Sequence, residues 1–105
     1  MARQPAAVRR MYVDGRWGQM HVRIADTENP SALPVVCFHL SPGSGRMFEA
    51  FLAEMGRDRM ACAPDTPGYG HSDPPPKPPD LTGYAAALGE VLDALEIDEV
   101  DLMGY

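Results

Sequence analysis

The chain alternates short apolar runs with segments of helical periodicity, and this alternation limits its fold more than any other feature. Residues 35–40 (VVCFHL) form a continuous apolar run, which is typical of a strand covered on both faces. Residues 60–63 and 100–103 have the same character and predict two further buried strands. Strands that alternate with helices indicate βαβ units and a parallel sheet with right-handed crossovers.

Two segments between the apolar runs have apolar residues at helical spacing. Residues 47–55 form the first, and Gly56 can end it. Asp80 or Thr82 can cap the second, whose stripe we expect to face the core. That stripe consists of Leu81, Tyr84, Ala85, Leu88, Val91, Leu92 and Leu95.

The N-terminal part reads as an antiparallel hairpin. Residues 8–13 and 17–25 are strand candidates around the turn dipeptide Asp14-Gly15. In the second strand, polar and apolar residues alternate with a period of two, which predicts a half-buried strand. The alternating polar residues are Gln19, His21 and Arg23. We therefore expect one domain, with an 8–25 β-hairpin followed by a 35–105 βαβαβ unit.

Charge and cysteine usage limit the partners. The formal net charge is −6 and no Lys/Arg run interrupts the acidity, so neither nucleic acid nor an anionic membrane is an expected partner. No apolar stretch has the length of a membrane span or signal-peptide core, and we expect a cytoplasmic location. Cys37 and Cys62 lie inside apolar runs, which predicts reduced, buried thiols rather than a disulfide or a metal site.

Three segments resemble motifs of the α/β-hydrolase family. Residues 38–44 (FHLSPGS) are similar to its His-Gly-X-Pro-Gly motif after strand three, and residues 63–73 (APDTPGYGHSD) to its D-x-P-G-x-G-x-S-D loop after strand four. Residues 100–105 (VDLMGY) are similar to strand five as it enters the nucleophile elbow. The resemblance implies a three-layer α/β-hydrolase fold with a mostly parallel sheet. The chain would be its N-terminal portion, the first five strands in the order 1-2-4-3-5.

The resemblance also implies an activity and site residues. Acyl transfer builds negative charge on a carbonyl oxygen, and preorganised backbone N–H groups stabilise it. By the family's pattern, the backbone N–H of Ser41 is such an oxyanion-hole donor, and Leu40 and Pro42 contact the substrate. Leu40 stands where the family usually has glycine. Tyr105 would flank the nucleophile, and the nucleophile, acid and histidine would lie beyond this chain.

The other polar residues of these motifs have more modest expected roles. By the resemblance, residues 65–73 form a mainly structural corner, in which Asp65 can bond nearby backbone donors. His39 is predicted to be a core histidine with satisfied hydrogen bonds. Neither His21 nor His71 matches the family's catalytic histidine, which follows the nucleophile in chain order.

The expected protein is a hydrolase of an ester, amide or related acyl bond, with a small-molecule substrate and with neither cofactor nor metal. An epoxide or carbon–carbon bond hydrolase and a non-catalytic hydrolase-fold binding protein stay open as alternatives. The residue after Tyr105 separates them, because Ser, Cys or Asp would support an enzyme and Gly or Ala a binding role.

The C-terminal end suggests two further expectations. Self-cleavage of the backbone at the strained elbow, just before the nucleophile, would explain a chain that ends at Tyr105. The alternative is that no cleavage reaction produces this end. Strand five would be an open edge in the isolated chain. The expected partner is therefore the remaining C-terminal part of the fold, as a continuation or as a second chain.

Overall fold

The computed structural model describes residues 4–104, which form one mixed sheet and two helices. The strands are β1 (Arg9–Gly15), β2 (Gly18–Ala25), β3 (Val35–Phe38), β4 (Ala61–Pro64) and β5 (Asp101–Gly104). The helices are α1 (Glu49–Met55), which a short 3-10 helix (Gly45–Phe48) precedes, and α2 (Leu81–Ala94). The spatial order is β1-β2-β4-β3-β5, which confirms the predicted order of the first five strands.

The strand directions show how the hairpin joins the βαβαβ unit. β2 is antiparallel to both β1 and β4, whereas β3 is parallel to both β4 and β5. The hairpin closes at the pair Gly15 and Gly18, so its turn is Arg16-Trp17 and the predicted turn at Asp14-Gly15 is wrong. Gly18 has a φ of +113°, a conformation that favours glycine, and this places the turn two residues later than the dipeptide indicated.

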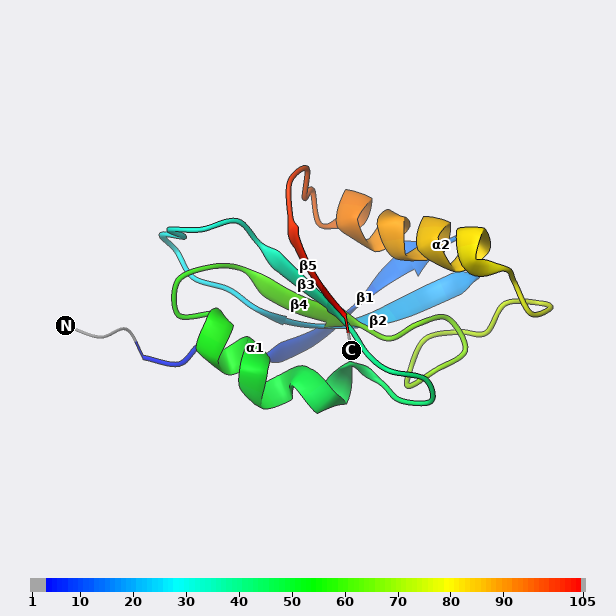
Figure 1. Cartoon of the computed structure of the whole chain (residues 1–105), viewed down its shortest axis with the longest axis horizontal. Coiled ribbons are helices and arrows are strands. Elements are labelled where there is room, and N and C mark those ends of the chain that lie inside the picture. Colours follow the sequence, from blue (N-terminus) through cyan, green and yellow to red (C-terminus); the bar gives the residue numbers. More distant parts are fainter. Residues whose placement is uncertain (1–3, 105) are drawn as a thin grey trace.

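The two helices cover opposite faces of the sheet, giving three layers (Figure 1). On the α2 face, Met20, Val22 and Ile24 of β2 join a core cluster with Val91 of the helix. On the α1 face, Ala25 belongs to a second cluster, whose other buried members are Val35, Cys37, Phe48, Leu52, Ala61 and Ala63. Because side chains alternate along a strand, His21 and Arg23 of β2 also lie on the α1 face.

Helix α1 ends where the sheet leaves no room for a side chain. Gly56 follows the helix, as predicted, and its N–H donates to the carbonyl of Leu52 at 2.8 Å. A Cβ at position 56 would lie 2.7 Å from the Cβ of Ala6 and 2.8 Å from that of Ala25. The glycine therefore both ends the helix and lets it approach the sheet closely.

Helix α2 begins as predicted, but its apolar stripe is only partly covered. Asp80 caps it, accepting the backbone N–H of Gly83 at 2.8 Å. Val91 is buried, whereas Leu81 is 86% exposed and Leu88 is half-buried. The helix thus faces the core in part, at Ala87 and Val91, and the rest of its stripe is incompletely covered within the described chain.

Strand β5 is also less buried than predicted. Leu102 is 66% exposed, and among the described strands β5 pairs with β3 alone. An apolar cavity of about 270 Å³ between β5 and α2 is lined by Phe38, Ala85, Leu88, Gly89, Leu92 and Leu102. A strand with one neighbour leaves its other edge uncovered, which is the open edge that the sequence predicts for strand five.

The cysteines match their prediction. Cys37 and Cys62 are free thiols, fully buried on β3 and β4. Burial raises the pKa of the Cys37 thiol to about 11 and that of Cys62 to about 12. Both therefore stay protonated near neutral pH and serve as small apolar core residues. In residues 4–104, neither helix is long and apolar enough to cross a membrane.

Candidate functional site

A buried carboxylate, Asp65, joins the loops at the carboxyl ends of β3 and β4. Its Oδ1 accepts the backbone N–H of Gly45 at 2.7 Å and lies 3.7 Å from Nη1 of Arg23. Its Oδ2 accepts the backbone N–H of His71 and the Nδ1–H of His21, both at 3.0 Å. The bonds to backbone donors are those that the sequence predicted for this residue, and the two side-chain contacts from β2 are additional.

The charges in this cluster favour an ionised Asp65 beside a neutral His21. Burial alone would raise the pKa of the Asp65 carboxyl. Hydrogen bonds from the N–H groups of His71 and Gly45 and from His21 together lower that pKa below its ordinary value. Burial, with smaller contributions from the charges of Arg23 and His71, lowers the pKa of His21 against the opposing effect of Asp65. The Nδ1 of His21 carries the proton, because a carboxylate can only accept.

His21 and Arg23 are more deeply buried than the alternation along β2 predicted. They are only 1% and 5% exposed. Helix α1 and the 65–73 loop cover the face of β2 that carries them, and the carboxylates of Asp65 and Glu49 lie beside the Arg23 guanidinium. Alternating polar and apolar residues show that a strand has two different faces, but they do not show what covers each face. Charged residues on one face are therefore expected to be exposed.

The loop after β4 is fixed to β2 by further hydrogen bonds. The Ser72 hydroxyl donates to the carbonyl of Asp65 at 2.7 Å and accepts the N–H of His21 at 2.9 Å. Asp73 accepts the N–H of Gln19 through Oδ2 at 2.8 Å, and its own N–H donates to the Gln19 carbonyl at 2.9 Å. These bonds hold both ends of the loop against the sheet and so position the residues between them.

His39 connects the loop after β3 to the loop after β4. It lies one residue beyond β3 and is half-buried, so the expected place inside a buried strand is wrong, whereas its expected satisfied hydrogen bonds are confirmed. Its Nε2 accepts the backbone N–H of Thr66 at 3.0 Å. The proton therefore sits on Nδ1, which donates to the carbonyl of Leu40 at 2.8 Å.

Ser41 is exposed at the tip of this loop, and its peptide bond to Pro42 is cis. Its hydroxyl lies 3.0 Å from the hydroxyl of Tyr69, whose ring packs 5.8 Å from the ring of His39. Among residues 4–104, no acceptor is paired with the Ser41 backbone N–H. This N–H is therefore available to an oxygen of a bound molecule. From the sequence, Tyr69 is only one residue of the structural corner at 65–73, and no periodicity marks its contact with Ser41.

Leucine in place of the family's glycine does not strain the loop. Of the described residues other than glycine, Glu96 alone has a positive φ, so Leu40 keeps an ordinary backbone. The close approach occurs instead at Gly43, where a Cβ would lie 2.7 Å from the carbonyl oxygen of Leu40. Glycine is needed at position 43, and the side chain of Leu40 is free to face outward.

The three predicted site residues that the structure describes are consecutive in the loop after β3 and border two different cavities. Leu40 and Pro42 border an open cavity of about 450 Å³, and Ser41 borders one of about 380 Å³ that also includes Tyr69 and Tyr84. Tyr105 lies outside the described residues, so its place beside a nucleophile and the self-cleavage stay predictions. Within residues 4–104, no group of three or more His, Cys, Asp or Glu side chains is arranged to hold a metal ion.

Comparison with known proteins gives similarity in structure only. No protein-family model and no curated protein matches the chain by sequence. A naproxen esterase from Bacillus subtilis is 28% identical, with a TM-score of 0.82 over 96% of this chain and 35% of the esterase. An N-acyl homoserine lactonase, complexed with N-hexanoyl homoserine, is 28% identical, with a TM-score of 0.83 over 94% of this chain and 36% of the lactonase.

An epoxide hydrolase from Vigna radiata has the same arrangement at 22% identity, with a TM-score of 0.81 over 93% of this chain and 32% of that enzyme. The chain thus spans about a third of the length of the structures that it matches. The strand order, the loops after β3 and β4, and the similarity to these structures all indicate the same fold. The chain has the fold of the N-terminal part of α/β-hydrolases, and its strands correspond to the first five strands of that fold's sheet.

Proposed function

We propose that this chain forms the oxyanion-binding side of the active site in a hydrolase of an ester, amide or related acyl bond. The nucleophile, histidine and acid would lie in the remainder of the fold. The observation that carries the proposal is the backbone N–H of Ser41, which is exposed and has no acceptor among residues 4–104. Two of the similar structures, each 28% identical, are an esterase and a lactonase, which supports an acyl substrate.

The sheet supports a nucleophile beside this N–H. β5 is parallel to β3, and Gly104 at the end of β5 pairs with Phe38 at the end of β3. A residue in the turn after β5 would therefore stand next to the loop that carries Ser41. Such a turn at the end of a strand is where the family's nucleophile elbow lies.

Two contacts of the loop support the proposal of an oxyanion donor that is in place before the substrate binds. His39 ties the loop to Thr66, and the hydroxyl of Tyr69 lies against that of Ser41. A donor held in place in this way needs no reorganisation when charge develops on the substrate. Both contacts would hold the backbone N–H of Ser41 in one direction while leaving it free to bind the substrate oxygen. We therefore infer that His39 and Tyr69 are positioning residues.

The test uses the folded protein with the remainder of the fold present. Hydrolysis of a p-nitrophenyl ester with an initial burst, and an acyl adduct found by intact-mass spectrometry, would support the proposal. Turnover of styrene oxide without turnover of the ester would favour the epoxide-hydrolase alternative. Absence of both turnover and adduct would contradict an enzyme and favour a hydrolase-fold binding protein.

A further inference from the structure

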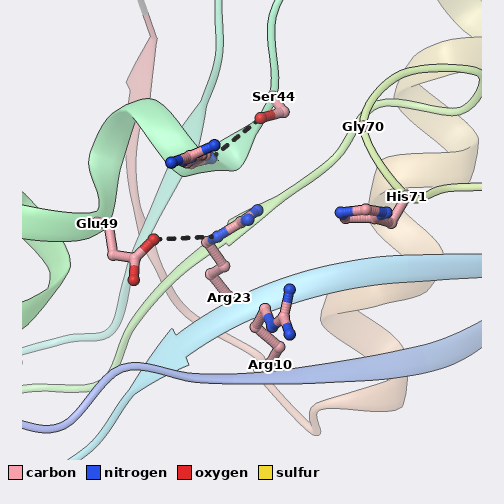
Figure 2. A pocket seen from close by; sticks show the side chains of 7 residues that line it. Arg10, Arg23, Ser44, Glu49, Gly70 and His71 are labelled. Atoms are coloured by element: carbon pink, nitrogen blue, oxygen red, sulfur yellow. Dashed lines mark hydrogen bonds and ion pairs between the residues drawn. The ribbon is translucent and has the colours of Figure 1, made fainter.

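A pocket rich in arginine lies on the α1 face, above the hairpin (Figure 2). It encloses about 350 Å³, and its lining includes Arg10, Arg23 and Arg46 together with Ser44 and His71. The arginines come from three separate elements, β1, β2 and the 3-10 helix. Neither the fold nor the proposed reaction accounts for this convergence of positive charge in a chain whose net charge is −6.

Two of the three guanidinium groups form no ion pair within the described chain, although Glu49 also lines the pocket. By contrast, Arg16 in the hairpin turn pairs with Glu90 of α2 at 3.1 Å. Among residues 4–104, neither Arg10 nor Arg46 has an ion-pair partner. Like charges that converge on one cavity repel each other, and a bound anion would remove that repulsion.

The third guanidinium is buried and incompletely satisfied. The side chain of Arg23 is 6% exposed, and its Nε and Nη1 make no hydrogen bond within the described chain. Its ion pairs, 3.4 Å to Glu49 and 3.7 Å to Asp65, are longer than hydrogen bonds. Figure 2 shows Arg23 extending between Glu49 and His71, with Arg10 beside it. Nε and Nη1 face these two carboxylates without making hydrogen bonds, so Glu49 and Asp65 offset the charge of Arg23 only in part, and Arg23 adds to the positive charge at the pocket.

Ser44 adds a neutral donor at the same place. Its hydroxyl oxygen accepts the backbone N–H of Arg46 at 3.3 Å. Within residues 4–104, its own proton is donated to no acceptor, so it can donate to a ligand. Gly70 completes the wall with backbone alone, because a Cβ there would meet both the carboxylate of Asp65 and the Cβ of Ser44.

We propose that this pocket binds the phosphate group of a small phosphate monoester. A monoester carries close to two negative charges at neutral pH and offers three acceptor oxygens, which suits guanidinium groups arriving from three elements. One arginine can satisfy a carboxylate with two parallel bonds, so three exceed what a carboxylate needs. The three arginines outnumber the nearby carboxylates of Glu49 and Asp65. A cavity of about 350 Å³ also leaves room for the organic part of a small ligand.

The test is calorimetric titration of glycerol 3-phosphate into the folded protein, with the remainder of the fold present, at low ionic strength. We expect saturable binding that Arg10→Gln and Arg46→Gln each weaken about tenfold, because each loses one charge-assisted contact. Arg9→Gln is the matched control. Arg9 is exposed on the same strand but faces the opposite side, so its loss should leave binding unchanged.

A variant that gains affinity separates the proposal from misfolding. Glu49→Gln removes the exposed carboxylate that competes for Arg23, and it should tighten binding several-fold. The proposal is overturned if no saturable binding occurs up to about 10 mM, if Arg9→Gln weakens binding as much as Arg10→Gln, or if acetate binds as tightly. Equal affinity for inorganic phosphate would overturn the assignment of a monoester.

Discussion

Replacing Asp65 with asparagine would show how much both loops depend on one buried carboxylate. Asparagine has nearly the same shape but no charge and a single acceptor oxygen. In the native protein, one carboxylate oxygen accepts the N–H of Gly45 and the other accepts the N–H of His71. Whichever way the amide turns, one of these backbone donors faces an NH₂ group and loses its acceptor.

The expected loss follows from these contacts. A buried donor left without an acceptor costs about 1–3 kcal/mol. Removing the charge of one partner from a buried ion pair costs about 3–5 kcal/mol, here for Arg23. Both costs arise from the same carboxylate and overlap, so we expect Asp65→Asn to lower the free energy of unfolding by about 3–5 kcal/mol.

Urea unfolding at pH 7, with the remainder of the fold present, measures this loss. Asp73→Asn is the matched control, because Asp73 is exposed and its carboxylate accepts a single N–H, from Gln19. That change should cost only about 0.5–1.5 kcal/mol. An Asp65→Asn loss no larger than the control's would refute the central role of this carboxylate.

The pH dependence gives an independent check. Because the folded pKa of Asp65 is lowered, its ionised form contributes stability at pH values above the ordinary aspartate pKa of about 3.9. That contribution is lost as the pH falls through the folded pKa. The difference in stability between the native protein and Asp65→Asn should therefore shrink at acid pH. A constant difference would contradict the assignment.

Further expectations concern neighbouring groups and the chain as a whole. Because the pKa of His21 is lowered, stability should fall as the pH drops below about 6.5, and His21→Asn should reduce that slope in urea unfolding at several pH values. Gly45→Ala should cost about 1–3 kcal/mol, since its Cβ would lie 2.5 Å from the carbonyl oxygen of Ala63, whereas Gly89→Ala meets nothing within 4 Å and should not destabilise. Residues 1–105 expressed alone should be insoluble or molten, and a sharp thermal transition would contradict this. If self-cleavage occurs, replacing the nucleophile with alanine should leave one uncut chain by intact mass, and continued cutting would exclude it.

The strands and helices could be predicted because local pattern determines them. The apolar run at residues 35–40 and the helical spacing of residues 81–95 each need only neighbouring residues to be recognised. The strand order came from the resemblance of three motifs rather than from periodicity. Even the hairpin turn was misplaced by two residues, because the conformation of Gly18 decides it and Asp14-Gly15 is the stronger local signal.

The parts that could not be predicted depend on contacts between distant segments. Asp65 and His21 are far apart in sequence, and no pattern near either one reveals that they bind each other. The contact of Ser41 with Tyr69 likewise arises only when the loops after β3 and β4 meet. Exposure of Leu81 reflects which surface lies under α2, and the helix's own spacing does not contain that information.

The measurement that tests the central claim most directly compares two substitutions of Ser41 by the kcat of ester hydrolysis. Ser41→Pro removes the backbone N–H, and loss of one oxyanion donor should cost about 2.7–4 kcal/mol, or roughly 10²–10³ in kcat. Ser41→Ala keeps the N–H and loses only the contact with Tyr69, so kcat should fall about tenfold or less. Thermal unfolding of both variants checks that the fold is retained. Equal large losses would show that the side chain acts instead, and equal small losses would show that this N–H takes no part in catalysis.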